Sequence, residues 1–379
     1  MGPLSGITII EMAGLGPAPF AAMMLADQGA RVIRVERPGA APAPRNVLCR
    51  NRSSIIVDLR TPAGRDVVLD LIEQADALIE GFRPGVMERL GLAPDTCMQR
   101  NPKLVFGRMT GWGQSGPLAA TAGHDLNYIS LTGVAHAVGH AGQAPVHPLN
   151  LVGDYGGGGM LLAFGVMCAL WEARHSGQGQ VIDAAMVDGA SALMAEYYSF
   201  MANNEFSDQR GTHLLDGGAH FYSMYQTLDG EYISVGALEP KFYAELLERL
   251  GMDGEPLPEQ YDQTQWPEMK ARLAELFATR TRAEWCELLE GTDACFAPVL
   301  YLGEVAEHPH HAARGTIIEV DGVKQAAPAP RFERTPAAQP QPPRMPGQDT
   351  RSVLESLGYS EQRVSELLDS GAVMQAAEP

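Results

Sequence analysis

The sequence predicts an α/β protein whose N-terminal half is a doubly wound domain. The chain of 379 residues is long enough for two domains. An apolar strand pattern at 7–11 is followed by a glycine- and proline-rich turn, a helical pattern at 20–28 and a second strand pattern at 31–36. Such a β-α-β unit implies a parallel sheet with a right-handed crossover. Further strand patterns, separated by helical stretches, occur at 53–57, 77–80 and 104–109.

The second half of the sequence combines long helical stretches with a small antiparallel segment. The apolar stretch at 160–173 is too short to span a bilayer and is predicted to be a buried helix. Residues 183–205 are predicted to form a second long helical stretch. Alternating segments at 221–227 and 231–235 flank Asp229-Gly230, which is typical of a tight hairpin turn. Further helices are predicted at 240–250, 267–278, 282–290 and 361–368, and an extended proline-rich arm at 327–346.

Charge is distributed unevenly along the chain. The net charge of -18 argues against nucleic-acid binding. Residues 1–108 nevertheless carry a net charge of +2, whereas the remainder carries -20. Guanidinium groups match the geometry of phosphate, so an arginine cluster within 31–60 predicts a site for an anion with several charges. Its seven members are Arg31, Arg34, Arg37, Arg45, Arg50, Arg52 and Arg60.

Neither a metal centre nor a membrane segment is predicted. The five cysteines are widely spaced and contain no CxxC pair, which favours reduced, mostly buried thiols. His308, His310 and His311 are close in sequence, but a polar loop is the simpler interpretation. Because the sequence shows no secretory, peroxisomal or lipidation signal, we expect a cytoplasmic protein.

A partial dinucleotide-binding motif follows the first strand. Gly14 and Gly16 are spaced as in a nicotinamide-binding turn, and Glu36 ends the second strand. Pro19 occupies the third glycine position and lacks an amide donor. We therefore interpret the segment as a similar turn that holds no nicotinamide.

Four glycine-containing segments need one explanation. They are Gly107 to Pro117, Gly123 to Tyr128 (GHDLNY), Asn150 to Gly159 (NLVGDYGGGG) and Ser176 to Gly189. Together with Arg83-Pro84-Gly85 and Leu357-Gly358-Tyr359-Ser360, they make the chain resemble the class III CoA-transferase (CaiB/BaiF-type) family and, within it, the α-methylacyl-CoA racemases. The resemblance covers nearly the whole chain.

The resemblance implies a Rossmann-like large domain built from both chain ends, a smaller α+β domain and an interlocked homodimer. It also implies an acyl-CoA substrate, no separate cofactor, and the interconversion of (2R)- and (2S)-2-methylacyl-CoA thioesters through an enolate. The expected boundaries are 1–185 and 325–379 for the large domain, 186–219 for a linker helix, 220–310 for the small domain and 311–324 for the return linker.

Three residues are candidates for the proton chemistry. A racemase needs a base on each face of a planar enolate, and His124 and Asp154 supply two unlike bases, as the resemblance implies. Glu239 matches the family's acidic residue that orients the histidine across the subunit boundary. Structural roles remain open: His124 as a hydrogen-bonded histidine, Asp154 as a helix N-cap and Glu239 as the cap of the helix that follows.

The resemblance also implies a set of CoA-binding residues, part of which falls within the arginine cluster. The set consists of Arg37, Val57, Asp58, Leu59, Arg60, Gly81, Phe82, Arg83, Arg89, Gly123, Asp125, Leu126, Asn127 and Tyr128.

Three alternatives compete with a racemase. In a CoA transferase of the same family, Asp154 attacks the thioester as a nucleophile; such an enzyme needs no second base, so His124 favours proton transfer. A non-catalytic CoA-binding protein does not need His124, Asp154 and Glu239 together. A nicotinamide dehydrogenase is the weakest alternative, because the motif at Gly14 is incomplete.

Overall fold

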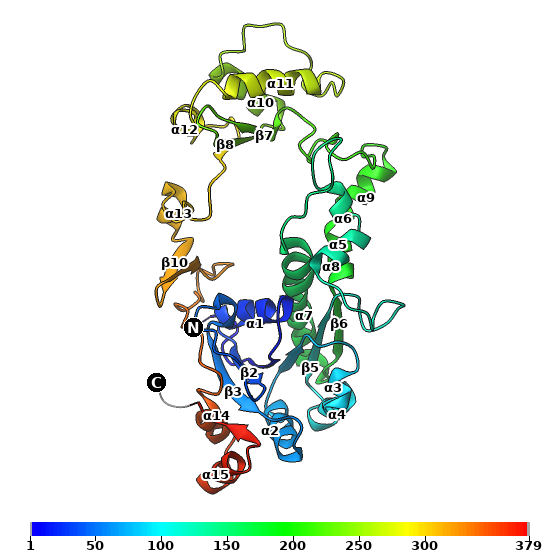
Figure 1. Cartoon of the computed structure of the whole chain (residues 1–379), viewed down its shortest axis with the longest axis vertical. Helices are drawn as coiled ribbons and strands as arrows, with labels where there is room; N and C mark the ends of the chain where they lie inside the picture. The colour runs from blue at the N-terminus through cyan, green and yellow to red at the C-terminus, as the bar shows by residue number, and fades with distance from the viewer. Residues whose placement is uncertain (1, 377–379) are drawn as a thin grey trace. The chain divides into compact units, whose positions relative to one another are not determined.

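The computed structural model describes residues 2–376, which form two compact units, each with its own hydrophobic core (Figure 1). The first unit contains residues 2–132, 149–193 and 315–376, so segments from both halves of the chain contribute to it. The second contains residues 133–148 and 194–314. The sequence analysis does not anticipate that 133–148 belongs with the second unit.

A seven-stranded sheet organises the first unit. Its strand order is β12-β3-β2-β1-β4-β5-β6, and every pair is parallel except β12 with β3. Strands β3-β2-β1-β4-β5-β6 have the order of a doubly wound sheet. Strands β1, β2 and β3 are added towards one edge and β4, β5 and β6 towards the other, so the topological switch point lies between β1 and β4. The predicted α/β class with a mainly parallel sheet is confirmed. The strands are β1 (Thr8–Met12), β2 (Arg31–Glu36), β3 (Arg52–Val57), β4 (Ala77–Glu80), β5 (Val105–Thr110), β6 (Val181–Ala185) and β12 (Val373–Met374).

Helices cover both faces of this sheet, as a parallel sheet requires. Adjacent residues of β1 point to opposite faces: Ile10 packs with α2, α4, α14 and α15, whereas Ile9 packs with α1 and α7. Both are fully buried. The helical elements are α1 (Pro17–Asp27), η1 (Val47–Cys49), α2 (Pro62–Glu73), α3 (Val86–Arg89), α4 (Pro94–Arg100), α5 (Asp125–Leu131), η2 (Leu151–Met160), α7 (Leu161–Ser176), α8 (Met186–Leu193), α14 (Thr350–Ser356) and α15 (Glu361–Asp369).

The glycine-rich segment before α7 is itself helical. Segment η2 is a π-helix that continues directly into α7, so the helix begins earlier than the sequence predicts. Its glycines allow close packing: a Cβ on Gly157 would lie 2.5 Å from the Ala190 nitrogen, and one on Gly159 2.7 Å from the Pro17 oxygen. Leu151–Ser176 is apolar and long enough to cross a membrane by composition alone, but half of its most apolar window is buried. It packs here as a core helix.

The helical stretch predicted at 183–205 is largely confirmed by α8 (Met186–Leu193) and α9 (Ala195–Ala202), but it is wrong for its first residues. Its first residues belong to β6, which pairs with β5 along the edge of the sheet, and α8 begins only at Met186. The alanine-rich composition favours a helix locally, whereas the unpaired edge of β5 favours a strand. Backbone pairing with β5 therefore overrides local propensity at 181–185.

The C-terminal part of the chain returns to the sheet. The proline-rich arm contains no helix or strand, as predicted, and runs beside β3, where the Gln341 oxygen accepts a hydrogen bond from the Asn51 nitrogen at 3.1 Å. The Gly347 nitrogen then donates to Ser54 Oγ at 2.9 Å. The hairpin of β10 (Ile317–Val320) and β11 (Val323–Ala326) precedes the arm.

The second unit is built around a small antiparallel sheet. The predicted hairpin about Asp229-Gly230 is confirmed, and β9 pairs with its second strand. Phe221, Trp266 and Trp285 are fully or nearly fully buried in the core beneath it. The elements are α6 (Val134–Ala137), α9 (Ala195–Ala202), β7 (Tyr222–Gln226), β8 (Tyr232–Gly236), α10 (Pro240–Arg249), α11 (Trp266–Phe277), α12 (Arg282–Leu289), β9 (Phe296–Pro298) and α13 (Pro309–Arg314).

A buried histidine makes the stability of this unit depend on pH. His220 is 1% exposed, its Nε2 lies 2.8 Å from the Tyr243 hydroxyl, and burial lowers its pKa to about 4. The unfolded chain, with an ordinary histidine pKa near 6.5, binds the proton more tightly. Stability from this group is therefore complete above about pH 6.5 and is lost as the pH falls towards 4.

We expect His220→Gln to remove this pH dependence. Between pH 7.5 and 5, the free energy of unfolding of the wild type should fall by about 2 kcal/mol more than that of the variant. Urea unfolding at both pH values measures the difference, with exposed His147→Gln as the matched control. Equal losses in wild type and His220→Gln would contradict the assignment.

Candidate active site

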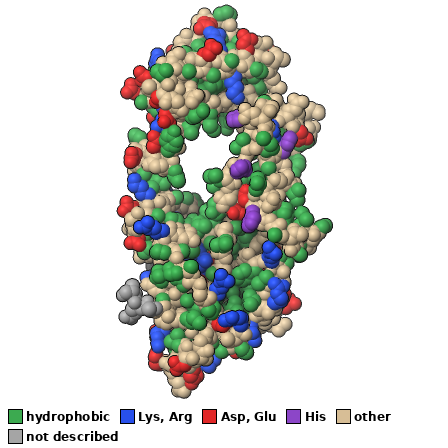
Figure 2. Space-filling view, viewed as in Figure 1, with side chains coloured by type: hydrophobic (Ala, Val, Ile, Leu, Met, Phe, Trp, Pro, Cys, Tyr) green, Lys and Arg blue, Asp and Glu red, His purple; other side chains and the backbone are tan. Residues whose placement is uncertain are grey.

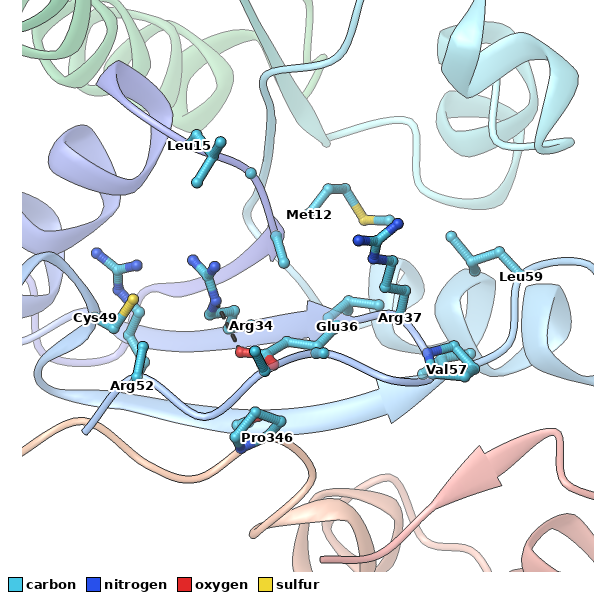
Figure 3. Close-up of a pocket in the computed structure, with 18 of the residues that line it drawn as sticks. Met12, Leu15, Arg34, Glu36, Arg37, Cys49, Arg52, Val57, Leu59 and Pro346 are labelled. Atoms are coloured by element: carbon cyan, nitrogen blue, oxygen red, sulfur yellow. Dashed lines mark hydrogen bonds and ion pairs between the residues drawn. The ribbon is translucent and has the colours of Figure 1, made fainter. Parts of the chain in front are cut away.

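A cavity of about 800 Å³ lies at the carboxyl ends of β1, β2 and β3 (Figure 3). Ligands of doubly wound sheets bind at this edge. Met12, Glu36 and Val57 end their strands at the cavity wall, and Pro346 of the C-terminal arm closes part of it. Six of the predicted CoA-binding residues line it: Arg37, Val57, Asp58, Leu59, Arg60 and Phe82.

Several members of the arginine cluster are held in internal ion pairs. Glu11 is fully buried and binds Arg34 at 2.6 Å and Arg52 at 2.7 Å. Arg34 also binds Glu36 at 2.9 Å, a contact drawn in Figure 3. Arg50 is buried and donates from Nε to an Asp27 carboxylate oxygen at 2.9 Å. These three arginines have carboxylate partners inside the protein, which leaves less of the cluster's charge for an anion, although Arg34 and Arg52 also line the cavity.

Other arginines of the cluster remain open to solvent. Arg37 extends from the end of β2 between Met12 and Leu59 (Figure 3) and is exposed. Arg60 binds Asp58 at 2.7 Å, but its side chain is 81% exposed. Figure 2 shows basic side chains gathered on the face of the first unit. Arg37 is thus the cavity-lining arginine best placed to meet a phosphate.

A buried ion-pair network fixes the loop after β4. The Glu80 carboxylate accepts hydrogen bonds from the Phe82 nitrogen at 2.7 Å and from Arg108 Nε at 2.9 Å. Arg108 also binds Glu88 of α3 at 2.8 Å. The loop that carries Gly81, Phe82 and Arg83 is therefore held at both ends, so Phe82 reaches the cavity from a rigid base.

The candidate catalytic carboxylate lies against the loop that lines this cavity. Asp154 is half-buried in η2, and Asn150 Nδ2 donates to its Oδ2 at 3.0 Å. The Asp154 nitrogen donates to Asp125 Oδ2 at 2.7 Å. A Cβ on Gly16 would lie 3.5 Å from Asp154 Oδ2, an ordinary van der Waals distance, so Asp154 lies close to the turn after β1.

Burial raises the pKa of Asp154, and the hydrogen bond from Asn150 opposes this rise. The Asp125 carboxylate also raises the Asp154 pKa, whereas His124 lowers it. His124 is thus close enough for its charge to act on Asp154. A carboxylate with a raised pKa is a stronger base, which suits proton abstraction near neutral pH.

His124 and its neighbours form the other side of the site. His124 is exposed at the N-cap of α5, where its backbone nitrogen donates to Asn127 Oδ1 at 3.0 Å. Tyr128 donates its hydroxyl to the Gly123 oxygen and packs edge-on against Trp112 with ring centroids 4.8 Å apart. These contacts fix the backbone of His124 while its ring stays accessible.

The structure thus brings the predicted residues into two neighbouring groups. One lines the cavity. The other surrounds Asp154 and consists of Gly123, His124, Asp125, Leu126, Asn127 and Tyr128. Arg83 lies near the second group, since its charge lowers the pKa of Tyr128 against the dominant effect of burial. Arg89 lies beside Gly85 in α3. Buried Asp125 directs one oxygen to the backbone of Asp154.

Two site features escape the sequence analysis. Asn150 precedes Asp154 by four residues, a helical spacing that signals a possible contact once 151–160 is known to be helical. Pro346 joins the cavity from a distant part of the chain, for which the sequence carries no local signal.

Glu239 lies exposed at the N-cap of α10 in the second unit. Within residues 2–376, no group of three or more His, Cys, Asp or Glu residues is arranged to hold a metal ion.

The chain belongs to CoA-transferase family III, whose sequence model matches residues 4–350. It is 45% identical to alpha-methylacyl-CoA racemase of Mus musculus over 368 residues, covering 96% of each chain. The identity to the Homo sapiens alpha-methylacyl-CoA racemase is 43% over 367 residues, again covering 96% of each. A crystal structure of a CAIB/BAIF family protein from Brucella suis shares the fold, with a TM-score of 0.81, 24% identity and coverage of 94% and 99%.

Proposed function

We propose that this protein is an α-methylacyl-CoA racemase. The observation that carries the proposal is the pairing of two unlike bases, Asp154 and His124, beside the cavity at the edge of the sheet. The near full-length similarity to two racemases supports the same reaction. CoA would occupy the cavity at Arg37 and extend its thioester past Gly14 to Gly16 towards Asp154.

The reaction needs no group beyond the side chains and the thioester. One base removes the proton from the α-carbon, and the electron pair of the broken C–H bond forms an enolate with the thioester carbonyl. The other base returns a proton to the opposite face and inverts the configuration. Asp154 and His124 take these roles in turn, so either enantiomer is a substrate.

Deuterium exchange tests the proposal. With a single (2R)- or (2S)-2-methylacyl-CoA in D₂O and no acceptor acid, we expect deuterium at the α-carbon and formation of the other enantiomer. A transferase would instead use Asp154 as a nucleophile and would move CoA to an added free acid. Transfer to the acid without exchange at the α-carbon would overturn the racemase proposal.

We also propose that the protein is a cytoplasmic enzyme and forms an interlocked homodimer. In this dimer, Glu239 of one subunit orients His124 of the other. An exposed apolar stripe on α7 supports an interface in the first unit: Phe164 and Trp171 are each 67% exposed and share a face with exposed Cys168. Monomeric proteins rarely expose such a continuous stripe. The exposed carboxylate of Glu239 is free to meet a partner.

Sedimentation and denaturation test the dimer. Trp171→Glu should weaken self-association, whereas Leu302→Glu, a control at a 91% exposed site outside the stripe, should not. In an interlocked dimer, dissociation and unfolding should occur together on dilution and denaturation. A folded, active monomer of the wild type would rule out the interlocked arrangement.

The cavity assignment predicts a binding effect at Arg37. Arg37→Ala should raise the KM for acyl-CoA about tenfold or more with little change in kcat, since a charge-assisted contact contributes about 1.5–3 kcal/mol. Arg60→Ala should have a smaller effect, because Arg60 already binds Asp58 and is mostly solvated. Calorimetry with free CoA measures both. Unchanged CoA affinity in Arg37→Ala would contradict the phosphate role.

Asn150 should tune the basicity of Asp154. Because its hydrogen bond holds the Asp154 pKa down, Asn150→Leu should raise that pKa further. The acid limb of kcat/KM should then move to higher pH for the enantiomer whose proton Asp154 removes. Exposed Asn203→Leu is the control. An unshifted acid limb would mean that the hydrogen bond is unimportant in the working enzyme.

A further inference from the structure

A second large cavity, about 660 Å³ in volume, lies within the second unit, and neither His124 nor Asp154 lines it. It is formed between the β7–β8–β9 sheet and the segments around α6 and α9. Its size falls in the range of small-molecule sites. Its walls are mainly apolar and aromatic, with Val134, Val138, Tyr197, Phe206, Leu215 and Phe296 among the lining residues.

One cationic side chain lines this apolar space. The protein has four lysines, and three of them, Lys103, Lys241 and Lys324, are exposed. The fourth, Lys270, projects from α11, is half-buried and lines the cavity. Its ammonium donates to the Gly217 oxygen. An ammonium has three donors, so two remain for a ligand.

The acidic residue whose charge acts on Lys270 is Asp216, and its carboxylate accepts hydrogen bonds from backbone nitrogens of its own loop. Asp216 also lines the cavity, but its Oδ2 accepts from the Gly211 nitrogen at 2.7 Å. Its Oδ1 accepts from the nitrogens of His213 at 2.9 Å and Gly218 at 3.0 Å. The Asp216 carboxylate therefore organises its own loop. Burial lowers the pKa of Lys270 and the Asp216 charge opposes this, so the ammonium lacks the full stabilisation of a direct ion pair.

We propose that the cavity of the second unit binds a monocarboxylate with an apolar tail, the carboxylate pairing with Lys270 Nζ and the tail contacting the aromatic and aliphatic walls. A charged head and an apolar body match the single ammonium and the surrounding side chains. An ammonium in a partly desolvated site gains most from an anionic partner. The site belongs to the second unit and does not depend on the racemase proposal.

Binding of octanoate to the full-length protein, without any CoA ester, tests this inference. Calorimetry should give saturable binding that weakens about tenfold or more in Lys270→Met, the effect of losing one charge-assisted contact. Lys241→Met removes an exposed lysine of the same unit and should bind octanoate as the wild type does. Ala297→Phe, which places a ring in the cavity wall without changing charge, should also weaken binding.

Two further measurements separate head from tail and exclude unfolding. 1-Octanol has a comparable tail and no charge, so it should bind at least tenfold more weakly than octanoate. In protein labelled with ¹³C at lysine Cε, octanoate should shift the Lys270 signal and leave the other three unchanged, which needs no variant at all. Equal octanoate affinity in Lys270→Met, or an unshifted Lys270 signal at saturation, would overturn the proposal.

Discussion

Replacing His124 by alanine is expected to reduce racemisation by about 10²–10⁴-fold, the usual contribution of a general acid or base. The variant can no longer carry a proton on the face that His124 serves. Asp154, held by Asn150, keeps its carboxylate. The variant should therefore still exchange deuterium into one enantiomer with retention of configuration, at a rate well above that of free substrate. Chiral analysis combined with mass spectrometry in D₂O measures both outcomes.

The matched variants sharpen this result. Asp154→Asn should lose racemisation to a similar extent and retain exchange, if any, in the opposite enantiomer. The double variant should be little worse than either single variant, because the two groups act in one relay. Exposed His310→Ala controls for the loss of a histidine. Racemisation near the wild-type rate in His124→Ala, with transfer of CoA to free acids, would instead identify Asp154 as a nucleophile.

The sequence predicts most of the sheet well, because its strands are short, mostly buried segments that alternate with helical segments along the chain. The runs at 31–36 and 77–80 coincide with β2 and β4, since both faces of the sheet are covered and most residues of these two strands are buried. It predicts β6 wrongly, because an edge strand is set by its neighbour β5 and not by its own residues. The π-helix at 151–160 is also determined by distant segments, since its glycines pack directly against the backbones of α1 and α8.

The site shows the same division between local and distant causes. His124 and Asp154 both occur in glycine-containing motifs, and the charge of His124 lowers the pKa of Asp154. The arginine cluster is dense in the sequence, but sequence spacing cannot show that Glu11 lies between Arg34 and Arg52 after the sheet forms. Charge counting therefore overestimates the charge available to an anion. Arg37 and Arg60 of the same cluster line the cavity, so the anion site stays a prediction for that cavity.

Glu11 is a buried carboxylate that pairs with two arginines of this region. Its carboxylate is fully buried and divides its two oxygens between Arg34 and Arg52, whose side chains are 13% and 1% exposed. Removing it would leave two guanidinium charges in a poorly solvated place. Breaking a buried ion pair in this way typically costs about 3–5 kcal/mol. Glu11→Leu should therefore lower the free energy of unfolding by about this amount and disturb the cavity wall that both arginines form.

Two comparison variants separate charge from packing. Glu36→Gln should cost clearly less than Glu11→Leu, because Arg34 keeps its bond to Glu11 at 2.6 Å. Replacing Glu11, Arg34 and Arg52 together by Leu, Met and Met should recover much of the stability, since apolar side chains of similar volume fill the space without unpaired charge. Urea unfolding compares the three variants. A loss below about 1 kcal/mol in Glu11→Leu would mean that water or movement of the arginines solvates the charges, and that the paired geometry does not govern the stability of this edge of the sheet.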